Sequence, residues 1–187
     1  MNRPRIAVMG TFDTKAEEYQ YIIDRIGQLG ADVLTIDVST RDTAVLRGEY
    51  GCREIAQYAG STYELLTSGT RAESMAIIME GATKLVRQLL QEGRIQGLVS
   101  IGGSGGTTLA THVMRALPIG FPKVIATTQA CSDKLPGFIS GKDIIVINSV
   151  VDVSGLNSII SHVYDEAAGA VVGAALAYTP HPADKPR

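Results

Sequence analysis

The chain has 187 residues, of which 45% are hydrophobic and 19% charged, and its formal net charge is −2. This length fits one domain with its own core, and the apolar share excludes an intrinsically disordered chain. The small negative charge provides no positive field for DNA, so nucleic acid is not expected as a partner. Cys52 and Cys131 have neither CxxC spacing nor a histidine at ligand spacing, which predicts no metal site and favours a reduced, cytoplasmic location.

The amino-terminal part predicts a strand, a helix and a second strand. Residues 5–9 and 32–38 form short apolar runs. An apolar strand so soon after a helix favours parallel pairing of the two strands. Residues 41–69 are less regular and predict a loop with a short helix near residues 55–58. The first helix is indicated by apolar side chains at steps of three and four residues, which are Tyr19, Ile22, Ile23, Ile26 and Leu29.

Strands and helices continue to alternate in the rest of the chain. Residues 71–91 carry one apolar face, and Thr70 with Glu73 has the spacing of a capping box at the start of this helix. The alternation predicts an α/β fold, a Rossmann-like open and mainly parallel sheet with helices on both faces. Further strands are expected at residues 97–101, 124–127 and 143–148, and further helices at residues 107–117 and 156–176.

The carboxyl-terminal part suggests a domain boundary. Residues 1–178 are expected to form the Rossmann-like domain, and the proline-rich residues 179–187 a linker to a second α/β domain of the same polypeptide. The apolar stretch at residues 167–178 is shorter than the roughly 20 residues that cross a bilayer, so no membrane partner is expected. Its Gly169 and Gly173 have the spacing that lets helices approach closely, and we expect a homo-oligomer.

The sequence GLVSIGGSGGTT places four glycines, a serine and two threonines at the end of the strand at residues 97–101. In an open parallel sheet, ligands bind at the carboxyl ends of the strands, against helix amino termini. Bare backbone amides and hydroxyls there predict a phosphate site, although a plain strand-to-helix turn remains an alternative. The P-loop and GxGxxG patterns are both absent. The candidate residues are Gly102, Gly103, Ser104, Gly105, Gly106 and Thr107.

A second polar turn, MGTFDTK, follows the first strand. Its hydroxyls predict further phosphate contacts, with Lys15 as a counter-charge. Thr14 has a structural alternative, because Thr14 and Glu17 match a capping box and the hydroxyl then only satisfies a helix amide. The candidate site residues of this turn are Gly10, Thr11 as a hydroxyl donor, and Asp13 as a metal or ribose contact.

Three other strand ends supply candidates. Asp37 ends the second strand, where a carboxylate can accept both ribose hydroxyls of a nucleotide, or simply be a solvated acid. Thr127 ends the strand at residues 124–127. Asp152 and Asn157 could complete a polar wall, but Asn157 could instead cap the final helix. No serine, histidine and acid are spaced as a triad, so the catalytic residues remain unassigned.

With RIAVMGTFDTK, SIGGSGGTT and NSVVDVSGLN in this order, the chain resembles the amino-terminal domain of the ATP-binding family named for the plant tobamovirus (tomato mosaic virus) resistance protein. The resemblance covers almost the whole chain. It implies a Rossmann-like half followed by a second α/β half, with ATP, alone or with Mg²⁺, held at the glycine motifs. The contacts that it implies are Gly10, Thr11, Asp13, Gly102, Gly103, Ser104, Gly105, Gly106 and Thr107.

These observations leave three functional hypotheses. The first is a domain that binds a nucleotide or small phosphorylated ligand, above all ATP, within a larger cytoplasmic protein. The second is half of a transferase or hydrolase that acts on a small phosphorylated or carboxylated metabolite and shares its active site with the missing domain. The third is self-association through the helix that carries Gly169 and Gly173.

Overall fold

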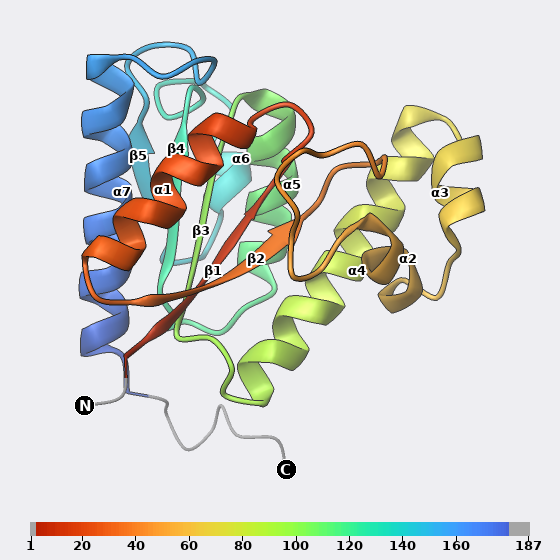
Figure 1. Cartoon of the computed structure of the whole chain (residues 1–187), viewed down its shortest axis with the longest axis horizontal. Helices are drawn as coiled ribbons and strands as arrows, with labels where there is room; N and C mark the ends of the chain where they lie inside the picture. Colours follow the sequence, from red (N-terminus) through yellow and green to blue (C-terminus); the bar gives the residue numbers. More distant parts are fainter. Residues whose placement is uncertain (1–2, 180–187) are drawn as a thin grey trace.

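The computed structural model describes residues 3–179 and contains one open sheet of five strands in that range. The strand order is β2-β1-β3-β4-β5, and every neighbouring pair is parallel (Figure 1). This confirms the predicted α/β fold class. The order reverses direction between β1 and β3, which are therefore the strands that flank the switch point of the sheet. The strands are β1 (Arg5–Gly10), β2 (Asp32–Asp37), β3 (Gly97–Gly102), β4 (Lys123–Thr127) and β5 (Ile145–Asn148).

Helices cover both faces of the sheet (Figure 1). One face carries α1 (Ala16–Gln28) and α7 (Ser158–Ala177), and the other carries α4 (Arg71–Gln91) and α5 (Ser104–Arg115). Side chains of β1 alternate between two buried clusters. Ile6 and Val8 join the cluster under α1 and α7, whereas Ala7 and Met9 join the cluster under α4 and α5. The shorter helices are α2 (Cys52–Tyr58), α3 (Tyr63–Ser68) and α6 (Leu135–Ile139).

Several element boundaries differ from the sequence prediction. Helix α5 begins at Ser104, so two of the glycines expected in a loop belong to its first turn. Helix α3 lies in the segment predicted as a loop with a single short helix. It is short, and its start is fixed by the Thr62 hydroxyl, which accepts a hydrogen bond from the Leu65 amide at 3.3 Å. Helix α6 was also missed, because it has five residues and no buried side chain.

Helix α7 confirms one local prediction, and a second one, the close approach at Gly169 and Gly173, is not used within the chain. The Asn157 side chain accepts hydrogen bonds from the amides of Ile159 and Ile160, both at 3.0 Å, so Asn157 is the helix cap. Gly169 and Gly173 are exposed, and a Cβ atom on either would meet nothing within 4 Å. No helix within residues 3–179 uses this close approach. The predicted linker at residues 179–187 lies, apart from Thr179, outside the described residues.

Candidate ligand-binding site

A cavity of about 700 Å³ opens at the carboxyl ends of β1 and β3. This is where the strand order reverses, the usual ligand position in doubly wound sheets. Both polar turns predicted from the sequence line this cavity, so they face the same rim of the sheet. The predicted residues that line it are Gly10, Thr11, Asp13, Gly102, Gly103, Ser104, Gly105 and Gly106.

The side chain of Tyr19, on α1, lies between the ends of β1 and β3. The two strands pair only from Ile6 to Val8 in β1. Beyond that point the Tyr19 hydroxyl donates a hydrogen bond to the Ile101 carbonyl at 2.7 Å and accepts one from the Ile101 amide at 3.2 Å. The Tyr19 hydroxyl thus replaces the missing strand partner of Ile101. Burial raises the pKa of Tyr19 to about 12, so the phenol keeps its proton at neutral pH.

Gly10 makes room for this tyrosine. A Cβ atom on Gly10 would lie 1.7 Å from Cζ of the Tyr19 ring, a distance that no packed structure tolerates. The absence of a side chain at position 10 therefore allows the ring to reach β3. Sequence reasoning assigned Tyr19 only to the apolar face of its helix, because the contact with Ile101 joins residues that are distant in the chain.

The turn from β3 into α5 exposes backbone amides to the cavity. Gly103 is the N-cap, and the Thr107 amide donates to the Gly103 carbonyl at 2.8 Å. The amides of Ser104, Gly105 and Gly106 precede this bond and have no helical acceptor. The first turn of α5 contains no acidic side chain. The amino terminus of α5 therefore presents the partial positive charge of the helix to the cavity.

Two predicted threonines support this turn from beneath. The Thr107 hydroxyl donates to the Gly103 carbonyl at 2.8 Å and lies 2.5 Å from the Thr127 hydroxyl. Thr127 in turn accepts a hydrogen bond from the Gln129 amide at 2.9 Å. Both threonines are fully buried, and neither lines the cavity. Their hydroxyls fix the shape of the turn and are not part of the cavity wall.

The turn after β1 differs from the capping prediction. The N-cap position of α1 is Lys15, whose side chain makes no cap hydrogen bond. Thr14 instead lies with its hydroxyl 3.1 Å from that of Thr11, so the predicted Thr14–Glu17 capping box is wrong. The ammonium group of Lys15 donates to the carbonyl of Val153 in the loop before α7. Thr11 and Thr14 thus offer two adjacent hydroxyls at the cavity wall.

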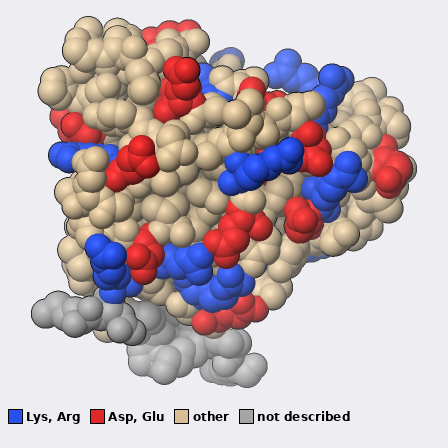
Figure 2. Space-filling view, in the orientation of Figure 1, with Lys and Arg blue, Asp and Glu red and all other residues tan. Residues whose placement is uncertain are grey.

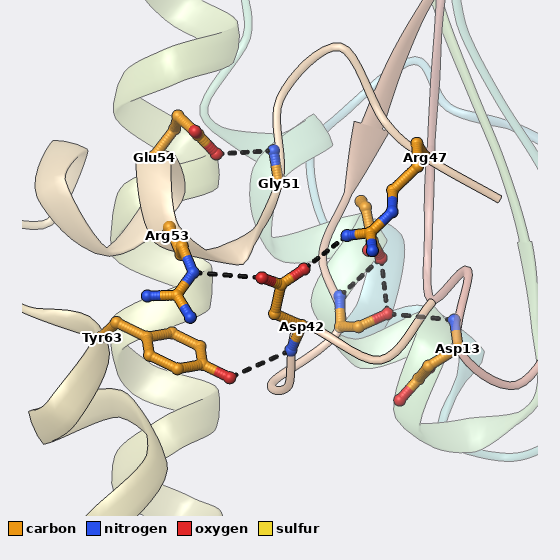
Figure 3. A network of polar contacts seen from close by, with 9 residues as sticks. Asp13, Asp42, Arg47, Gly51, Arg53, Glu54 and Tyr63 are labelled. Carbon is orange, nitrogen blue, oxygen red and sulfur yellow. Dashed lines mark hydrogen bonds and ion pairs between the residues drawn. The ribbon is translucent and has the colours of Figure 1, made fainter. Parts of the chain in front are cut away.

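Asp37 joins the turn after β1 to the loop after β2. Its Oδ1 atom accepts hydrogen bonds from the Phe12 amide at 3.1 Å and from the amide and hydroxyl of Ser39 at 3.0 and 2.5 Å. The Ser39 hydroxyl also accepts from the Asp13 amide at 3.2 Å (Figure 3). Burial raises the pKa of the Asp37 carboxyl. Asp37 supports the two loops, and the structure does not bring it, or the exposed Asp152, into the cavity wall.

Cationic side chains outnumber acids in the cavity wall. Lys15, Arg41 and Arg71 line it, with Asp13 as the acidic side chain. Neither Arg41 nor Arg71 takes part in an ion pair within residues 3–179. Arg71 lies beside the amino terminus of α5. A Cβ atom added to Gly105 would be 4.0 Å from the Nη2 atom of Arg71. Neither arginine belongs to a recognisable motif, so sequence reasoning did not place them in the site.

An apolar wall faces these polar groups. It is formed by Leu66 from α3, Met75 from α4 and Leu109 from α5. Beyond the cavity, acidic and basic side chains are interspersed on the face of the molecule in Figure 2, with no broad area of one sign. The combination suits a ligand that has an anionic group and an apolar or aromatic part.

Two features are absent from the described part of the chain. Within residues 3–179, no group of three or more His, Cys, Asp or Glu side chains is arranged to hold a metal ion. The same range contains no helix that is both long and apolar enough to cross a membrane.

Comparisons with known proteins give close relatives. A UPF0261 protein of Clostridium tetani is 41% identical over 174 residues, which are 92% of this chain and 43% of that protein. A UPF0261 protein of Brucella suis is 40% identical over 186 residues, 99% of this chain and 44% of that protein. The ToMV resistance protein Tm-1 of Solanum lycopersicum is 28% identical over 192 residues, 92% of this chain and 25% of that protein.

The chain therefore spans less than half the length of these relatives. Among solved structures, a diflavin flavoprotein A3 from Nostoc sp. is 12% identical, with a TM-score of 0.47 over 94% of this chain and 96% of that chain. Residues 4–180 match the family described as "Uncharacterised protein family (UPF0261) N-terminal domain". The chain belongs to the UPF0261 family and corresponds to its N-terminal domain.

Proposed function

We propose that the cavity binds a nucleotide, with ATP as the leading candidate, through phosphate groups at the amino terminus of α5. The observation that carries this proposal is the uncompensated positive charge at that point. Three backbone amides without a helical acceptor lie beside the Arg71 guanidinium, and the first turn of α5 has no acid. A cation at the positive end of a helix is unfavourable unless an anion joins them.

The rest of the wall supports a nucleotide over a bare anion. The hydroxyls of Thr11 and Thr14 add neutral donors on the side of β1. The side chains of Leu66, Met75 and Leu109 offer an apolar surface to a base. Asp13 is the carboxylate that could approach a Mg²⁺ ion carried by the phosphates. The proposal concerns this domain within a longer protein.

The test is isothermal titration with ATP and Mg²⁺ on the wild-type chain and on a Gly103→Val variant. Gly103 has an extended backbone, and a Cβ atom there meets only the Thr128 hydroxyl, at 3.9 Å, so valine fits the fold. Its side chain would be added at the N-cap of α5, a position that lines the cavity. We expect saturable binding that the variant weakens by at least about tenfold, since charge-assisted hydrogen bonds to phosphate are lost.

Gly173→Val is the matched control. Gly173 is exposed on α7 and does not line the cavity, and a Cβ atom at this position would meet nothing within 4 Å. The affinity of this variant for ATP should equal that of the wild type, and circular dichroism should show the same helix content in all three proteins. Absence of saturable binding, or equal affinity in Gly103→Val, would contradict the proposal.

A further inference from the structure

We infer that Arg41 and Arg71 hold two different anionic groups of one ligand, so that the cavity selects nucleoside di- and triphosphates over monophosphates. This inference rests on the proposed function and adds the ligand class to it. Its starting point is that both guanidinium groups line the cavity and that neither has an acidic partner within residues 3–179.

Arg71 belongs to the first anion position, at the amino terminus of α5. It is the first residue of α4, and the reciprocal cap of Thr70 and Glu73 fixes the backbone there. The Thr70 amide donates to Glu73 Oε2 at 2.7 Å, and the Glu73 amide donates to the Thr70 hydroxyl at 3.3 Å. A phosphate bound to the α5 amides therefore meets a guanidinium whose backbone is already in place.

Arg41 belongs to a second position, in the loop after β2. On one side of it in the chain, Ser39 is anchored by Asp37 and in turn anchors the Asp13 amide. This connects the Arg41 loop to the turn after β1, whereas Arg71 lies beside α5. The two arginines thus enter the cavity from different segments of the chain.

The residue after Arg41 is held even more firmly (Figure 3). The Asp42 carboxylate pairs with Arg47 at 2.7 Å and with Arg53 at 3.1 Å, and the Asp42 amide donates to the Tyr63 hydroxyl at 3.2 Å. The hydrogen bonds from Arg53 and Arg47 hold the pKa of Asp42 below its usual range. The nearest acid in the chain is therefore occupied by other cations, which leaves Arg41 available for a ligand.

Lys15, Arg41 and Arg71 against Asp13 give the wall an excess of two positive charges (three minus one), so the placement of the arginines, and not the total charge, argues for more than one phosphate. A single phosphate monoester carries about −1.5 to −2 charges at pH 7, and Arg71 with the α5 amides can satisfy it. The ammonium group of Lys15 already donates to the Val153 carbonyl. Arg41, in the loop after β2, would then have no phosphate beside it, whereas a second phosphate along the chain of the ligand would pair with it.

The experiment measures the affinities of ATP, ADP and AMP by isothermal titration on the wild type and on Arg41→Met, Arg71→Met and Arg87→Met. Methionine keeps an unbranched apolar stem and removes the charge. Arg87 is the matched control, because it is exposed on α4 and does not line the cavity. Since Arg41 and Arg71 are exposed and make no ion pair within residues 3–179, we expect all variants to fold, which thermal denaturation checks.

The wild type should bind ATP and ADP at least about tenfold more tightly than AMP. Arg41→Met should weaken ATP binding by about tenfold or more and leave AMP binding within about twofold, whereas Arg71→Met should weaken both. Arg87→Met should change neither. Equal wild-type affinities for ATP and AMP, or an unchanged ATP-to-AMP ratio in Arg41→Met, would overturn the inference.

Inorganic tripolyphosphate separates this inference from the proposed function. If the wild type binds tripolyphosphate through Arg41 but binds no nucleotide, the pairing of two anionic groups with the two arginines stands, whereas nucleotide binding and the selection among nucleotides are refuted. If it binds ATP and AMP equally, nucleotide binding stands and the inference is refuted. If neither tripolyphosphate nor any nucleotide binds, both are refuted.

Discussion

Removing one hydroxyl group, in Tyr19→Phe, tests the account of how the cavity is formed. The hydroxyl is buried and satisfies both the carbonyl and the amide of Ile101, at 2.7 and 3.2 Å. Phenylalanine keeps the ring and leaves these two backbone groups without their partner. Each buried unsatisfied polar group costs roughly 1–3 kcal/mol. Because the adjoining cavity can admit water, we expect a loss of about 2–4 kcal/mol in the free energy of unfolding at pH 7.

The loss should shrink at alkaline pH. The pKa of Tyr19 is about 12 in the folded chain because burial raises it from 10.0. The hydroxyl therefore contributes stability that is fully present below pH 10 and is lost as the pH rises from 10 to 12. The slope approaches about 1.4 kcal/mol per pH unit. Between pH 7 and pH 11, the gap between the wild type and the variant should narrow by about 1.4 kcal/mol.

Urea unfolding followed by circular dichroism at 222 nm measures this gap. Tyr58→Phe is the control, because Tyr58 is only partly buried and its hydroxyl makes no hydrogen bond described in this structure. It should differ from the wild type by less than about 0.5 kcal/mol. A Tyr19→Phe variant as stable as this control, or a gap that stays constant up to pH 11, would refute the bridging role of the hydroxyl.

Two further substitutions test the packing around the site and the opposite edge of the sheet. Gly10→Ala should destabilise the chain by about 2–4 kcal/mol in urea unfolding, since the new methyl group displaces the Tyr19 ring. Gly173→Ala is the control: position 173 has open space around it, and alanine should stabilise α7 by about 0.5–1 kcal/mol. Lys123→Met should cost about 1–3 kcal/mol, because the carbonyls of Pro118 and Phe121, 2.9 and 2.6 Å from the buried ammonium group, lose their donor, whereas the Asp143 carboxylate is 39% exposed and can be hydrated. A loss that persists when Asp143→Asn is added would locate the cost in the two carbonyls, and a Lys123→Met variant of wild-type stability would contradict it.

The sequence predicted the fold well where local patterns decide it. Apolar periodicity located β1, α1 and α4, and the Thr70–Glu73 capping box marks the start of α4 as expected. The prediction from the sequence failed where local patterns are ambiguous. Thr14 and Glu17 have capping-box spacing, yet Thr14 bonds with Thr11, because the turn after β1 is shaped by its contacts to the loop after β2.

The candidate site divides in the same way. Glycines and hydroxyl side chains at a strand end can be recognised in the sequence, because few other residues allow a tight turn there. Arg41 and Arg71 cannot be recognised in this way, because their role depends on which loops meet above the sheet. Asp37 looked like a ligand contact, and its buried carboxylate is used instead to join two loops. Residue type at a strand end therefore predicts the site, but not which side chains face it.

The cavity itself depends on a contact that no local pattern contains. At the switch point, α1 and α5 leave the sheet on opposite faces, so nothing in the topology continues the pairing of β1 with β3. Without another partner, the amide and carbonyl of Ile101 would be buried with no hydrogen bond. Tyr19 supplies both bonds from α1, and Gly10 gives the ring its space. The crevice between the two strand ends can thus stay open without a ligand, because the amide and the carbonyl of Ile101 are already satisfied.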